Sequence, residues 1–181
     1  MNNNNKHKYA GFTLIDQMIV VSIVMILVGQ ALPSISSTLK KNQITSVYNE
    51  ALAALNYARS IAVTTGSWAT LCKSNQAGTA CALSQSTPWT HGWIVFEDAN
   101  NNGVINAGER IHLQNNTLPS QILINYSRNK KRISYHAEGY AVGYNGKISF
   151  CDSQNRINKT MVISNSGRVR LAQAHELGRC Q

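Results

Sequence analysis

An apolar run at residues 12–32 is the feature that most constrains what this chain can fold into. The run holds 21 residues and a single charged side chain, Asp16. As an α-helix it would be about 31 Å long, which is about the thickness of the hydrocarbon core of a bilayer. Lys6 and Lys8 precede it and supply the positive charge that is typical of the cytoplasmic side. We therefore predict that residues 12–33 form a membrane-spanning helix.

Two other interpretations compete for this run. An ordinary secretory signal would end at a small-residue cleavage site such as Gly29-Gln30-Ala31, and a plain membrane anchor would need no particular residues. Asp16 and Gln17 interrupt the apolar core that a signal peptide requires. We favour neither alternative.

The stretch Gly11-Phe12-Thr13-Leu14-Ile15-Asp16 resembles the N-terminal signature of type IV pilins and type II secretion pseudopilins. The resemblance implies that a prepilin peptidase cuts after Gly11, removes a leader at residues 1–11, and leaves Phe12 as an N-methylated terminus. It also implies that Asp16, where the family usually has Glu, neutralises the terminal amine of a neighbouring subunit during assembly. The protein would cross the inner membrane once, keep its head in the periplasm and enter a surface pilus.

The pattern after Pro33 is helical at first. Apolar residues recur there at three- and four-residue spacing, with polar residues between them, which predicts an amphipathic half of the helix at residues 34–66. The predicted buried face consists of Ile44, Val47, Ala51, Ala54, Leu55, Ala58, Ile61 and Ala62.

From residue 67 the pattern becomes alternating and is interrupted by turn residues, which predicts a β-rich globular head at residues 67–181. Many short strands after one long helix favour an α+β fold, with the helix packed on an antiparallel sheet, as in the pilin and GspH-like folds. We place strands at residues 68–73, 92–97, 110–114, 122–127, 132–136, 147–151, 160–164 and 168–172.

All four cysteines lie in the part of the chain that would be exported. An even number of cysteines outside the cytoplasm indicates disulfides rather than metal ligands, and four cysteines allow three pairings. We favour Cys72–Cys81, which closes a short loop, and Cys151–Cys180, which would attach the C-terminal tail to the sheet.

One segment fits the spacing of a calcium-binding loop. Its oxygen-bearing side chains would be Asp98, Asn100, Asn102 and Glu109, with Gly103 at the sharp turn. The flanking residues have the pattern of strands rather than helices, so we favour a turn that caps its own backbone. Residues 92–109 also resemble a hairpin segment of GspH- and FimT-type minor pilins.

Positive charge is concentrated near the C-terminus. The whole chain carries a formal charge of +9, and residues 110–181 hold eleven basic residues against three acidic ones. Arg168 and Arg170 stand two positions apart in a predicted strand, so their side chains share one face and could hold neighbouring phosphates. The other candidate basic residues are Arg156, Lys159 and Arg179, with a second run at Lys130, Lys131 and Arg132.

The motif Gly167-Arg168-Val169-Arg170 resembles the Gly-Arg-x-Arg motif of FimT-type minor pilins, which bind DNA for uptake in natural transformation. The resemblance implies a minor type IV pilin that binds extracellular DNA without sequence specificity. The competing hypothesis is a structural minor pilin or type II secretion pseudopilin that primes or caps a filament. The sequence contains no motif of an enzyme and none for a cofactor. We expect DNA, other pilin subunits, the prepilin peptidase and the inner membrane as partners.

Overall fold

The computed structural model describes residues 11, 13–116, 118–119, 121–152, 154, 157–178 and 180, with side chains described for all of these except 30–36, 157 and 158. Helix α1 (Leu14–Thr65) is followed by eight strands and two short 3-10 helices, η1 (Trp89–His91) and η2 (Ala174–Glu176). The chain divides after Leu39 into two units, of which the second is Lys40–Gln181.

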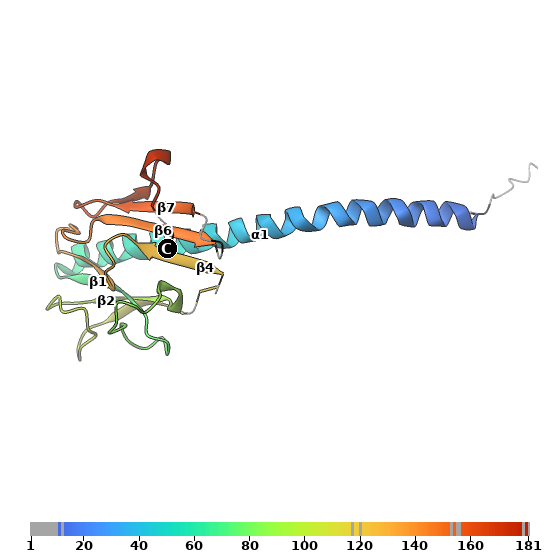
Figure 1. Ribbon diagram of the computed structural model, residues 1–181. Helices are drawn as coiled ribbons and strands as arrows, with labels where there is room; N and C mark the ends of the chain where they lie inside the picture. Colours follow the sequence, from blue (N-terminus) through green and yellow to red (C-terminus); the bar gives the residue numbers. More distant parts are fainter. Residues whose placement is uncertain are drawn as a thin grey trace, which may run out of the picture. The chain divides into compact units, whose positions relative to one another are not determined.

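Eight strands form two antiparallel four-stranded sheets in the second unit (Figure 1). The first sheet has the order β3-β2-β1-β5 and the second has the order β4-β6-β7-β8. All eight strands that the sequence predicts are present, although as two sheets rather than one. Their bounds are β1 (Ala69–Lys73), β2 (Trp93–Glu97), β3 (Ile111–Asn115), β4 (Ile122–Tyr126), β5 (Arg132–Tyr135), β6 (Gly146–Asp152), β7 (Ile157–Ile163) and β8 (Val169–Leu171).

The second part of α1 packs against both sheets and forms one core with them. All eight apolar residues predicted for the buried face of the helix are buried, which confirms the amphipathic pattern. Leu71 and Ile133 reach this core from the first sheet, and Phe150 and Met161 reach it from the second. The α+β fold of the prediction is therefore confirmed.

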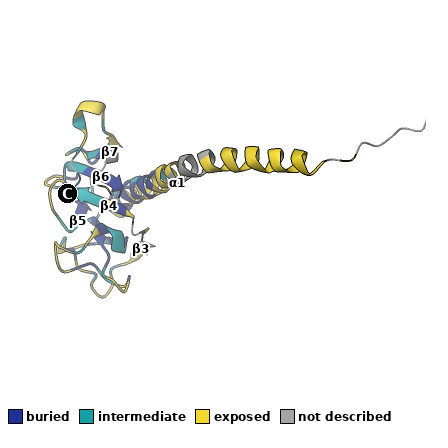
Figure 2. Cartoon of the chain, turned by 45° about the vertical axis from the view of Figure 1, so that its right-hand side comes forward, coloured by how far each residue is buried: buried dark blue, intermediate teal, exposed yellow. Residues whose placement is uncertain are grey.

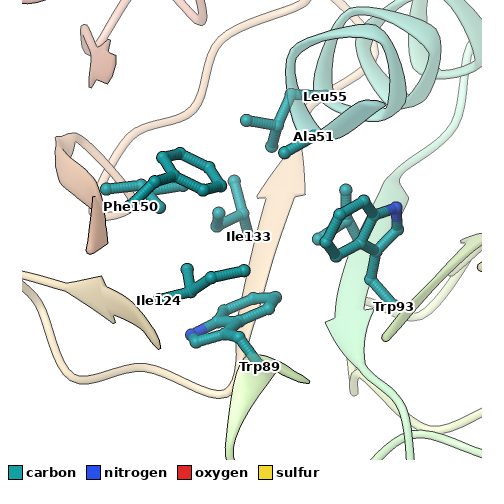
Figure 3. Close-up of a pocket in the computed structure, with 9 residues that line it drawn as sticks. Ala51, Leu55, Trp89, Trp93, Ile124, Ile133 and Phe150 are labelled. Carbon is teal, nitrogen blue, oxygen red and sulfur yellow. The ribbon is translucent and has the colours of Figure 1, made fainter. Parts of the chain in front are cut away.

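A small gap remains at the centre of this core, between α1 and the two sheets. Leu55 from the helix, Phe150 from β6 and Trp93 from β2 point toward it (Figure 3). Its volume is about 20 Å³ and its lining is apolar, so it is a packing gap and not a ligand site.

The first part of α1 differs in character from the second. Its large apolar side chains between Leu14 and Val28 are exposed in this structure (Figure 2). Within the described residues, no helix combines the length and the apolar character needed to cross a bilayer.

The structure contains both disulfides that we favoured from the sequence. Cys72 of β1 is bonded to Cys81, and Cys151 of β6 is bonded to Cys180 near the end of the chain. The second bond attaches the C-terminal tail to the face of the second sheet that points away from α1. We call this face, which is opposite the core residues Phe150 and Met161, the outer face.

Candidate nucleic-acid interface

Arg168 lies directly before β8, and Arg170 lies within β8. Ser164, at the end of β7, pairs with Arg168 through a backbone hydrogen bond, and Gly167 closes the turn by donating to the Ser164 carbonyl. Gly167 has a φ of 76°, and a Cβ atom there would lie 2.0 Å from the Gly139 carbonyl oxygen. Glycine is therefore required at this position by backbone geometry. This explains the first residue of the Gly-Arg-x-Arg motif without any contact to a ligand.

Arg168 and Arg170 lie on the outer face of the second sheet, as their spacing predicts. Val169, between them, packs against the core, and Arg170 is paired in register with Val162 of β7. Alternation along the strand therefore places both arginines on the opposite side from the core. Both residues are exposed.

The two arginines differ in what they contact. Within the described residues, the guanidinium of Arg168 has no hydrogen-bond or ion-pair partner. Arg170 instead binds both carboxylate oxygens of Glu176, at 2.6 and 2.7 Å, in the bidentate geometry that arginine also uses for phosphate. One arginine of the motif is thus available and the other is engaged within the chain.

Glu176 belongs to η2, in the C-terminal tail. Its carboxylate also accepts a hydrogen bond from the backbone of Gln173, which closes a capping box around the short helix. The hydrogen bonds from Arg170, and then the one from Gln173, lower the pKa of Glu176 to about 2. Because this pKa is below its ordinary value, the pair is intact at neutral pH and is lost only as the pH falls toward 2.

The tail crosses the outer face just beyond η2. The Gly178 amide donates to the Thr160 hydroxyl of β7, and a Cβ atom on Gly178 would lie 2.0 Å from the Ser149 hydroxyl oxygen of β6. The disulfide of Cys180 follows two residues later. The tail is therefore held at a fixed place beside the two arginines.

Lys159 lies on the other face of the same sheet. It is paired in register with the core residue Phe150, and its ammonium group lies 5.1 Å from the ring centroid of Tyr48 on α1. The sequence hypothesis that Lys159 joins Arg168 and Arg170 in one patch is therefore not supported by its position. Arg156 and Arg179, the other candidates near this patch, lie outside the described residues.

The side chains of residues 130–132 contact several different groups, and Lys130 and Arg132 both contact Tyr144. The Lys130 ammonium lies 4.5 Å from the Tyr144 ring centroid, and Lys131 donates to the Leu83 carbonyl. Arg132 donates to the Asn101 carbonyl and lies 3.6 Å from the Asp98 carboxylate. Arg132 is therefore a structural residue of the loop that begins at Asp98, and each of the three side chains already contacts another group of the chain.

The segment with calcium-loop spacing, residues 98–109, is held by its own groups. The carboxylate of Asp98 is buried and accepts hydrogen bonds from the Thr70 hydroxyl and the Gly103 amide. The Asn100 and Asn102 side chains accept from amides two residues ahead, and Glu109 accepts from the Asn106 amide. Among the described residues, no group of three or more His, Cys, Asp or Glu side chains could hold a metal ion.

The N-terminal signature residues are only partly described. Gly11 is exposed, and Phe12 lies outside the described residues. The Asp16 carboxylate accepts hydrogen bonds from the amide and the hydroxyl of Thr13, so within this chain it caps the start of α1.

Two residues near Arg170 on the second sheet, Glu176 and Lys147, are not among the site residues predicted from the sequence. Glu176 is one of only three acidic residues after position 109, and that scarcity was the available signal. Lys147 lies on the outer face of β6, in register with Val162 and thus in one row with Arg170. Its position in a predicted strand indicated a face, but not which strand would be its neighbour.

The family model for the type II transport protein GspH matches residues 48–167. Two crystal structures of the type IV minor pilin FimU of Pseudomonas aeruginosa are similar to the chain at 19% sequence identity. They give TM-scores of 0.59 and 0.56, covering 78% and 76% of this chain and 98% and 99% of the FimU chains. A comparison with curated proteins gives no match. The chain therefore belongs to the GspH family and has the fold of a FimU-like minor pilin.

Proposed function

We propose that this protein is a minor pilin of a type IV pilus that binds extracellular DNA without sequence specificity, for uptake in natural transformation. The observation that carries the proposal is the exposed pair Arg168 and Arg170 on one sheet face, in the half of the chain with a net charge of +8. Guanidinium groups bind phosphates in bidentate fashion, and contacts to phosphates carry no sequence information.

The proposal extends to processing and location. The prepilin peptidase would cut after Gly11, and residues 12–33 would anchor the chain in the inner membrane before assembly. Its partners would be other pilin subunits and DNA. The exposed apolar side chains at the start of α1 support this proposal, because a filament or a membrane would cover them.

A second function is favoured by one specific observation. Glu176 already occupies the Nη1–Nη2 edge of the Arg170 guanidinium, which is one of the edges that a phosphate could use. A structural minor pilin or pseudopilin, which primes or caps a filament without DNA, would need no free guanidinium at this position. The two functions differ in whether removing the arginines changes DNA binding.

The test is DNA binding by the full chain, measured by fluorescence anisotropy with a labelled duplex at low salt and at 200 mM salt. A neutral detergent covers the apolar side chains of α1 without adding charge. We expect the double variant Arg168→Gln/Arg170→Gln to bind at least tenfold more weakly than the parent. The slope of log K against log salt should also become flatter by about 1.8, because each phosphate contact contributes about 0.9.

The matched control is Lys41→Gln/Arg110→Gln, which removes two exposed charges away from the outer face. It should bind within about threefold of the parent, since it changes only the long-range field of the protein. Equal weakening by the two double variants would show that net charge alone attracts DNA. If the parent does not bind DNA at low salt, the structural minor pilin or pseudopilin remains as the function.

A further inference from the structure

A polar pocket lies on the outer face of the second sheet, between the ends of β4 and β6 and the C-terminal tail. Its volume is about 470 Å³, which is within the range of small-ligand pockets. Lys147 is the cation of this pocket, and none of the described residues that line it is acidic. The lining includes Ser127, Asn129, Lys147, Ser149, Leu177 and Gly178.

The register of the sheet places this pocket beside the two arginines. Lys147 of β6 is paired with Val162 of β7, and Val162 is paired with Arg170 of β8. Directly paired residues of antiparallel strands point to the same face, and neighbouring strands are about 4.8 Å apart. The backbones of Lys147 and Arg170 are therefore about 10 Å apart on one face, with Val162 of β7 between them in the register.

The backbone of Lys147 is held firmly, whereas its side chain is not. Its amide donates to the Ser127 hydroxyl, and its carbonyl accepts from the Ser127 amide. Within the described residues, its ammonium group has no hydrogen-bond or ion-pair partner. A cation that is unpaired in a pocket without carboxylates is suited to bind an anion.

We propose that Lys147 and this pocket form a phosphate subsite that continues the DNA path from Arg168 and Arg170 across the outer face. A backbone phosphate binds the Lys147 ammonium, and the hydroxyl and amide groups of the pocket receive the adjoining sugar. This inference rests on the proposed function, because the ligand is the same DNA strand. It adds a third cation that the motif at residues 167–170 does not contain.

The sheet offers a matched pair of lysines for the test. Lys147 lies on the outer face, and Lys159 lies on the face toward α1, over Tyr48. Lys147→Gln, Lys147→Arg and Lys159→Gln are compared with the parent and with Arg168→Gln/Arg170→Gln in the anisotropy assay. Folding of each variant is checked by circular dichroism.

We expect Lys147→Gln to weaken DNA binding about three- to tenfold and to flatten the salt slope by about 0.9, the value for one phosphate contact. Lys147→Arg should restore the affinity, and Lys159→Gln should bind like the parent. If Lys147→Gln and Lys159→Gln bind DNA equally well while Arg168→Gln/Arg170→Gln binds more weakly than the parent, the subsite is overturned. The proposed function would then remain in place. A parent that does not bind DNA would overturn both.

Discussion

Arg170 and Glu176 form the most strongly defined contact on the candidate DNA surface. The carboxylate presents two oxygens to the guanidinium in the arrangement that a phosphate would present, so Glu176 would compete directly with the proposed DNA ligand for this arginine. The side chain of Arg170 is still 46% exposed, so a strand of DNA can reach it. At the residue scale, the DNA affinity that we propose for this surface would therefore depend on Glu176 as well as on Arg168 and Arg170.

Replacing this acid should strengthen DNA binding. Glu176→Gln removes the charge that neutralises Arg170, so we expect a gain of about three- to tenfold in affinity at low salt, measured by anisotropy. Glu138→Gln, which removes an exposed acid from the loop after β5, is the matched control and should have a smaller effect. Unchanged or weaker binding by Glu176→Gln would indicate that Arg170 remains bound to the tail when DNA is present.

At the element scale, the loop between β2 and β3 shows how a calcium-like spacing can be stabilised without a metal. Asp98 is fully buried, and the cation near it is the guanidinium of Arg132 from β5. Gly103 lies against that guanidinium with a φ of 71°, a backbone conformation that favours glycine at this point of the loop. The loop is therefore attached to the sheet by a charge that comes from a distant strand.

Removing Arg132 should destabilise the fold. Arg132→Gln leaves the buried carboxylate of Asp98 without its cation, and we expect a loss of about 3 kcal/mol in the free energy of unfolding. The measurement is urea denaturation followed by tryptophan fluorescence. The double variant Asp98→Asn/Arg132→Gln should recover part of the loss, because it buries no unpaired charge.

Calcium provides the independent check on this loop. Added calcium should leave the melting temperature of the parent unchanged, since the loop is already held by Arg132 and its own side chains. A calcium-dependent rise in melting temperature would contradict the structural role that we assign to Arg132.

At the scale of the whole molecule, the C-terminal tail joins the candidate site to the core of the second unit. The tail leaves β8, forms η2 and returns across β7 and β6 to its disulfide with Cys151. It therefore sets the position of Glu176 and one wall of the pocket beside Lys147. The Cys151–Cys180 disulfide therefore contributes both to the stability of the fold and to the geometry of the candidate DNA surface.

The two disulfides should contribute unequally to stability. Cys151 and Cys180 are separated by 29 residues, and Cys72 and Cys81 by 9, so the first bond restricts the unfolded chain more. We expect Cys151→Ser/Cys180→Ser to lower the free energy of unfolding by about 1 kcal/mol more than Cys72→Ser/Cys81→Ser, measured by urea denaturation. Equal losses would indicate that the buried environment of the sulfurs, rather than loop length, determines the cost.

The sequence by itself determined the features that depend on local periodicity. The buried face of α1, the eight strands and the shared face of Arg168 and Arg170 all follow from spacing along the chain, because helices and strands repeat their side-chain directions at fixed intervals. The cysteines allowed three disulfide pairings, and the structure decided between them. The turn at Gly167 also follows from local chemistry.

Only the tertiary structure decided which neighbours each charged side chain has. Sheet pairing placed Lys159 toward α1 and brought Lys147 into line with Arg170, although in sequence Lys159 is the closer to Arg170. Folding of the tail brought Glu176 onto Arg170, and the loop after β2 placed the Asp98 carboxylate beside Arg132. The physical reason is that the interaction between two charged groups depends on their distance in space and not on their separation in the sequence. Strand order and the path of the tail set those distances, and the local sequence pattern does not encode them.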